Sequence, residues 1–213
     1  MLKYESETSA KKAGPAPSGG KGLLRRLFRE RTGATAIEFA ILAVPFMLVV
    51  FATLETFVAF TGEQLLANAT ETMARKIRTG EITSGVNPAT DMDQEVFRRA
   101  FCDEIAIIMT CSPTEATTAS KLFIDVRSYD NFSDIPTDIP RKVSSDRSSD
   151  FNPTGFKFDP GGPKSINVLR AFYRWDVATD LVRPYVTNLR PAGSSMPHDY
   201  LMVSTATFVN ENY

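Results

Sequence analysis

The residue with the clearest chemical consequence is Glu38, a carboxylate near the start of an apolar run that extends from Ala34 to about Phe60. A helix of about 27 residues is long enough to cross a lipid bilayer. A carboxylate at the centre of such a helix costs about 2.5–3.5 kcal/mol in lipid. Glu38 therefore needs either a cationic partner or a position at the membrane surface. An amine one helical turn away would suit it, whereas the alternative is an interfacial glutamate that only reaches the lipid headgroups.

Residues that could perform catalysis or hold a metal are sparse. His198 is the only histidine, so a hydrolase with a Ser-His-Asp triad would have to use it, and no Gly-x-Ser-x-Gly motif accompanies it. The chain has no His-Glu-x-x-His motif, no His/Cys cluster and no aspartate spacing of the EF-hand type. We expect no catalytic residue, no metal and no cofactor. A hydrolase that uses His198 stays as an alternative.

Charge is distributed unevenly along the chain. Residues 1–33 hold eight lysines or arginines and three glutamates, a net charge of +5, whereas the whole chain has a net charge of -1. Basic residues next to an apolar span remain on the cytoplasmic side of a membrane. The pattern predicts a cytoplasmic N-terminus and an exported C-terminal domain. A nucleic-acid-binding tail is the alternative, but we expect no nucleic-acid partner because the charges lie where a topology signal belongs.

The two cysteines, Cys102 and Cys111, are nine positions apart. This spacing differs from the C-x-x-C pattern of metal and redox sites. Two isolated cysteines can be buried free thiols. In a domain exported to an oxidising compartment, we expect them to form a disulfide.

Hydrophobic periodicity predicts the elements around these residues. Helical spacing continues past Phe60 through Leu66, Met73 and Ile77, so we expect one helix of about 45 residues that ends near Gly80. A short surface helix is expected at 23–29, and a second long helix at 91–109, capped by Thr90 or Asp91. Alternation predicts strands at 121–129, 166–177 and 200–209. A polar loop of unusual length, at about 130–165, is expected to be functional or mobile.

These elements define an α+β fold, in which a long N-terminal transmembrane helix is followed by a small domain with an antiparallel sheet packed on helices. We divide the chain into a basic leader at 1–33, a transmembrane helix at 34–62 and an extracytoplasmic domain at 63–213.

A processing junction fits before the apolar run, because the run is too long for an ordinary secretory signal. Cleavage after Gly33 would make Ala34 the first mature residue, Glu38 the fifth and Phe39 the sixth. This arrangement resembles the prepilin signal of the type IV pilin superfamily. Residues 31–41, with a proline soon after, resemble the TadE-like minor pseudopilins of the tight-adherence (Flp-type) pilus.

The resemblance continues beyond the helix. The cysteine pair and the segments 122–132, 158–163, 173–175 and 206–213 all look like that family. The C-terminus departs slightly, because the family tends to end in Arg-Asn-Glu-Pro-aromatic whereas this chain has Val209 and Asn212.

The resemblance implies a pilin-like fold and cleavage after Gly33 by a membrane-embedded aspartyl prepilin peptidase, which would recognise Gly33, Glu38 and Phe39. The new amine on Ala34 would then be neutralised by Glu38. Partners would be the bacterial inner membrane, the peptidase, other pseudopilins and the pilus assembly machinery, with the C-terminal domain in the periplasm or at the pilus. The alternative is an uncleaved single-pass inner-membrane protein with a periplasmic binding domain.

Overall fold

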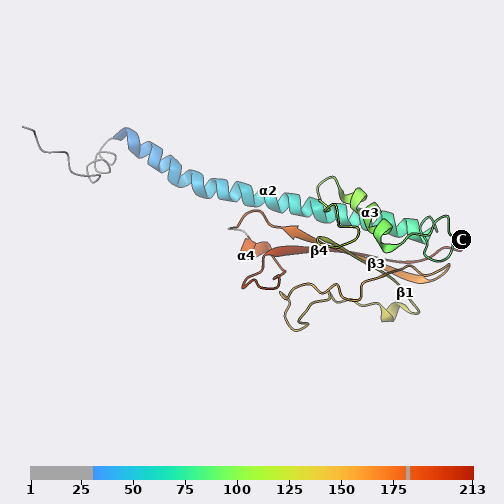
Figure 1. Cartoon of the computed structure of the whole chain (residues 1–213). Helices are drawn as coiled ribbons and strands as arrows, with labels where there is room; N and C mark the ends of the chain where they lie inside the picture. The colour runs from blue at the N-terminus through green and yellow to red at the C-terminus, as the bar shows by residue number, and fades with distance from the viewer. Residues whose placement is uncertain (1–30, 181–182) are drawn as a thin grey trace, which may run out of the picture. The chain divides into compact units, whose positions relative to one another are not determined.

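The computed structural model describes residues 31–180 and 183–213, with side chains from residue 35 onward, and Figure 1 shows the order of their elements. The chain divides into two compact units, Met1–Leu48 and Val49–Tyr213. The predicted helix at 23–29 lies outside the described residues.

The longest element is helix α2 (Arg31–Arg78), whose 48 residues contain the apolar run and the amphipathic segment after it. This confirms the single long helix. The helix ends before Gly80, which has a φ of +78°, a conformation that suits glycine. A Cβ at Gly80 would lie 2.6 Å from the ring of Tyr213, so the close approach of the C-terminus also requires a glycine there.

Helix α3 (Gln94–Ile105) begins later and ends earlier than predicted. Its N-terminal cap is Asp93, whose side chain accepts a hydrogen bond of 2.8 Å from the backbone N–H of Val96. The prediction of a cap at Thr90 or Asp91 was wrong. The carboxylate of Asp91 accepts hydrogen bonds from the preceding loop, including one of 2.6 Å from the hydroxyl of Thr83.

Four strands form one sheet in the order β2-β1-β3-β4. Strands β1 (Leu122–Tyr129), β3 (Ile166–Asp176) and β4 (Asp199–Val209) pair antiparallel, as predicted. Strand β2 (Phe158–Asp159) pairs in parallel with β1, so the sheet is mixed rather than wholly antiparallel. A strand of two residues is too short to produce a recognisable alternation. The α+β class is confirmed, and the two remaining short elements are η1 (Phe132–Asp134) and α4 (Arg183–Val186).

One face of the sheet packs against α3 and the C-terminal part of α2, which runs along the sheet in Figure 1. The buried side chains between these layers include Met73, Phe101, Ile124 and Leu169. This main core holds the amphipathic part of α2 firmly against the domain, because each large buried side chain contributes about 1.5–3 kcal/mol.

The opposite face of the sheet is covered rather than solvated. Phe151, from the predicted loop, is 1% exposed and packs against Phe123 and Phe172. Asp125, on the same face of β1, is 2% exposed and accepts two hydrogen bonds of 2.7 and 2.6 Å from the guanidinium of Arg127. The segment at 130–165 therefore includes a structural part that closes a second small core.

Candidate functional site

Helix α2 is the one helix among the described residues that is long and apolar enough to cross a membrane. It carries no charged residue between Glu38 and Glu55. Its large side chains in this part are exposed, with Phe39 at 75% and Leu42 at 70%. Continuous exposed apolar surface is typical of a surface that contacts lipid or another protein. The helix fits a single-pass membrane protein.

The predicted processing residues lie in the first turns of α2. Gly33 and Ala34 have helical backbone, and the side chains of Glu38 and Phe39 are exposed. Because Glu38 stands one helical turn after Ala34, a charge on the backbone amine of Ala34 would be within reach of its carboxylate. The exposed carboxylate could equally receive a cation from a second chain.

A second carboxylate on α2, that of Glu55, joins the helix to the domain. It accepts a hydrogen bond of 2.5 Å from the backbone N–H of Ala178 and bonds of 3.1 and 3.2 Å from the backbone N–H of Thr179. These two residues follow the end of β3. Bonds from backbone donors to a charged acceptor are among the stronger hydrogen bonds in proteins. The helix is therefore fixed to the domain from Glu55 onward.

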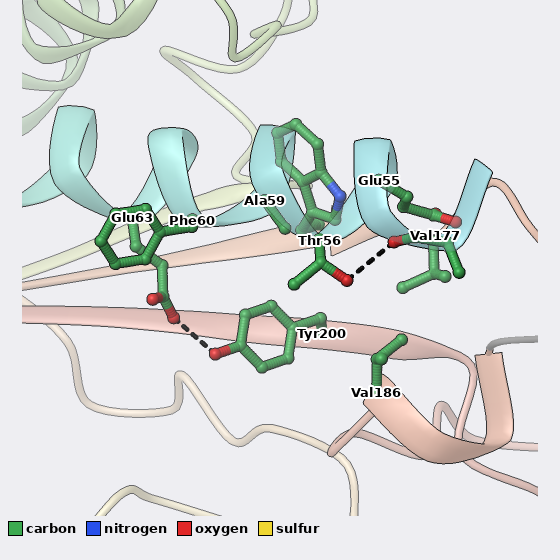
Figure 2. Close-up of a pocket in the computed structure, with 10 residues that line it drawn as sticks. Glu55, Thr56, Ala59, Phe60, Glu63, Val177, Val186 and Tyr200 are labelled. Carbon is green, nitrogen blue, oxygen red and sulfur yellow. Dashed lines mark hydrogen bonds between the residues drawn. The ribbon is translucent and has the colours of Figure 1, made fainter. Parts of the chain in front are cut away.

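A groove of about 310 Å³ opens between this part of α2 and the adjacent ends of β3 and β4. Figure 2 shows its walls, with Glu55 and Glu63 contributed by the helix and Tyr200 by β4. The remaining surface is mainly apolar, and its large side chains are Phe60, Trp175, Val177 and Val186. A groove with an apolar floor and few polar groups suits an apolar ligand or segment.

The hydroxyl of Tyr200 donates a short hydrogen bond to the carboxylate of Glu63, drawn as a dashed line in Figure 2. Burial, together with this bond to a carboxylate, raises the pKa of Tyr200 to about 12. Tyr200 thus remains a neutral donor at physiological pH, and the pair is a second connection between α2 and the sheet.

Sequence reasoning missed both connections. The only signal for Glu55 in the sequence is that it is a second carboxylate in the apolar run. Its partners follow it by 123 and 124 positions, and backbone N–H groups carry no sequence signature. The partner of Tyr200 is Glu63, and a glutamate on the polar part of a helix gives no sign in the sequence that it will bind a tyrosine.

Cys102 on α3 and Cys111 beyond its end form the expected disulfide. The bond closes a loop with a sequence separation of 9. It ties the C-terminal end of α3 to the segment that leads into β1.

His198 lies beside Asp199, with 2.7 Å between the imidazole Nδ1 and the carboxylate Oδ1. The side chain of His198 is 48% exposed, and Asp199 also lies 3.8 Å from a guanidinium nitrogen of Arg174. A hydrolytic triad needs a nucleophile on the other imidazole nitrogen. The hydrogen bonds of the described residues give His198 no serine, threonine or cysteine partner. The arrangement is that of a hydrogen-bonded pair of neighbouring residues at the start of β4.

The segments 158–163 and 206–213 meet at the end of the sheet. The amide of Asn210 donates hydrogen bonds of 2.8 Å to the carbonyl of Gly161 and 3.1 Å to that of Gly162. It also lies 2.9 Å from the hydroxyl of Tyr213. The C-terminal segment and the glycine turn before β3 therefore hold each other in place.

Comparison of the chain with curated proteins and with solved structures gave no match. Comparison with protein-family models matched one stretch, which begins at the predicted processing junction and covers most of α2. Residues 33–75 match the model described as TadE-like protein, so this segment of the chain is similar to that family.

Proposed function

We propose that this chain is a minor pseudopilin of a tight-adherence (Flp-type) pilus, cleaved after Gly33 by a prepilin peptidase and active in starting pilus assembly or at the pilus tip. The TadE-like match suggests involvement in this pilus system, and one observation carries the finer proposal. The match begins at Gly33, and Glu38 and Phe39 stand exposed on the same apolar helix.

Cleavage would create the cation that Glu38 needs. It would leave a positive amine on Ala34, four positions before Glu38. Residues at this spacing are neighbours on a helix, so the two charges can pair within one chain or between adjacent subunits. The loss of a leader with a net charge of +5 would also remove the charges that hold the end of the helix at the cytoplasmic surface.

The C-terminal domain would act by contact rather than by catalysis. The disulfide between Cys102 and Cys111 supports an extracytoplasmic location, because such bonds persist in oxidising compartments. The basic leader supports the same orientation. In this position the domain would select other pseudopilins and the assembly machinery.

The test is the intact mass and N-terminal residue of the protein isolated from its native membranes. The unaltered chain should begin at Ala34, and a Gly33→Val variant should retain the leader. Gly22→Val is the matched control, since it changes a glycine of the leader outside the junction and should leave processing unchanged.

A full-length chain from both the unaltered gene and the Gly33→Val gene would contradict the proposal. That result would favour the uncleaved single-pass membrane protein with a periplasmic binding domain.

A further inference from the structure

In the membrane-spanning arrangement of the proposed function, the length of the apolar run would bring the groove residues of α2 to the membrane boundary. The uncharged stretch between Glu38 and Glu55 contains 16 residues, which rise about 24 Å as a helix. The hydrocarbon core of a bilayer is about 30 Å thick and takes about 20 residues. A span that starts at Phe39 therefore reaches about residue 58. Glu55, Thr56 and Ala59, which line the groove, lie at that level along the helix.

The carboxylates at this level are already partnered by the domain. Glu55 accepts backbone hydrogen bonds from Ala178 and Thr179, and Glu63 accepts the hydroxyl of Tyr200. A carboxylate near lipid is costly mainly when its charge is left without partners. These bonds explain how the apolar segment accommodates Glu55, and they leave a groove whose open surface is mainly apolar.

Aromatic side chains gather around the same end of the domain. Trp175 and Tyr200 line the groove, and Tyr185 on α4 is 87% exposed. Phe57 and Phe60, on the helix, are also exposed. Tryptophan and tyrosine are enriched where proteins meet the boundary between lipid and water, because their rings are amphipathic. Exposed phenylalanines in the same place indicate a surface that is covered in its working environment.

We infer that this groove receives an acyl chain of a membrane phospholipid, from the leaflet on the side of the domain. The proposal rests on the membrane-spanning helix of the proposed function. A lipid chain is favoured because the wall formed by Ala52, Ala59 and Phe60 continues the exposed apolar surface of α2. Both groove carboxylates already accept hydrogen bonds from the domain, so the groove offers chiefly apolar contact to its occupant.

Trp175 provides a direct test, because it is the only tryptophan of the chain. The full chain is reconstituted in phosphatidylcholine vesicles with and without dibrominated acyl chains, which quench tryptophan on contact. With Trp175 at the lipid boundary, bromination of the acyl chains should cause a loss of its fluorescence. Resistance to alkaline carbonate extraction is measured on the same vesicles, and an extracted chain would contradict the anchoring on which the inference rests.

A displaced reporter is the matched control. The double variant Trp175→Phe/Phe208→Trp moves the tryptophan to the other end of the paired strands, since residue 175 pairs with Tyr200. Position 208 lies about 26 Å farther along β4. Bromination should leave this reporter unchanged. Quenching of neither reporter, or equal quenching of both, would overturn the inference.

The occupant is identified with a phospholipid that carries a photoreactive group in its acyl tail. Labelling should map to the groove segments of α2 and of residues 175–180 and 183–186. It should fall at least severalfold in Val186→Glu, which places a charge in the groove, but not in Val203→Glu, on an exposed position of β4 outside it. Equal labelling of both variants, or labelling that maps outside the groove segments, would contradict a lipid occupant. Processing at Gly33 is measured separately, so failure of the groove inference leaves the pilus proposal standing.

Discussion

The carboxylate of Glu55 accepts hydrogen bonds from the backbone N–H of Thr179, a residue that follows it by 124 positions. The bonds join the last part of the apolar run to the turn after β3. The boundary between helix and domain is therefore not the end of the apolar sequence. It lies within that sequence, at the first residue that the domain holds.

Removing this carboxylate should loosen the helix from the domain. Glu55→Ala leaves the N–H groups of Ala178 and Thr179 without their acceptor, and we expect a loss of about 1–3 kcal/mol in the free energy of unfolding. Thermal unfolding of the full chain in detergent measures the change. Glu71→Ala, which removes an exposed glutamate from the same helix, should stay within about 0.5 kcal/mol of the unaltered protein. Equal effects of both variants would show that Glu55 does not join the two parts.

Tyr200 should make stability sensitive to alkaline pH. Burial and the bond to Glu63 raise the pKa of Tyr200 in the folded chain to about 12, from the ordinary tyrosine value of 10.0. The folded chain thus holds this proton more tightly than the unfolded chain. The contribution of Tyr200 to the free energy of unfolding is therefore complete below pH 10 and is lost as the pH rises towards 12. The melting temperature of the unaltered protein should fall in this range more steeply than that of Tyr200→Phe.

The control for that pH series is Tyr185→Phe, because Tyr185 is 87% exposed. The melting temperature of Tyr185→Phe should change with pH in the same way as that of the unaltered chain. If the melting temperatures of the unaltered chain and of Tyr200→Phe fall in parallel as the pH rises, the raised pKa of Tyr200 does not contribute to stability.

The disulfide should stabilise the domain through the short loop that it closes. Replacing Cys102 and Cys111 together by alanine is expected to cost about 2–3 kcal/mol, since the loop has a sequence separation of 9. Denaturant unfolding of the double variant, compared with the oxidised and the reduced native chain, measures this. The unfolding midpoint of the reduced native chain should lie close to that of the double variant. If the double variant and the reduced chain both unfold at the same midpoint as the oxidised chain, α3 and the segment before β1 are held together by packing alone.

Glu38 should be required for contact with other pilus subunits. Glu38→Ala removes the carboxylate that stands one helical turn after Ala34, so in the proposed function other subunits should no longer co-purify with the chain. Val143→Ala changes an exposed residue of the segment at 130–165 and should leave co-purification intact. Retention of the partners by Glu38→Ala would argue against its role in assembly.

The element pattern could be predicted well from local sequence. Continuous helical spacing from residue 34 to Ile77 predicted α2, and alternation predicted β1, β3 and β4. Local signals were less reliable where side chains compete for partners. Asp91 has the right type and place for a helix cap, but its carboxylate is used by the loop before it, so Asp93 caps α3.

The sequence by itself determined the apolar helix, the cysteine pair and the arrangement of Gly33, Glu38 and Phe39, because each depends on residue types at short separation. Only the tertiary structure decided the partners of Glu55 and Glu63, the groove beside them and the covering of the second face of the sheet by Phe151. These depend on contacts between residues far apart in the chain. A backbone N–H or a tyrosine in a strand looks the same in the sequence whether or not folding brings a carboxylate to it.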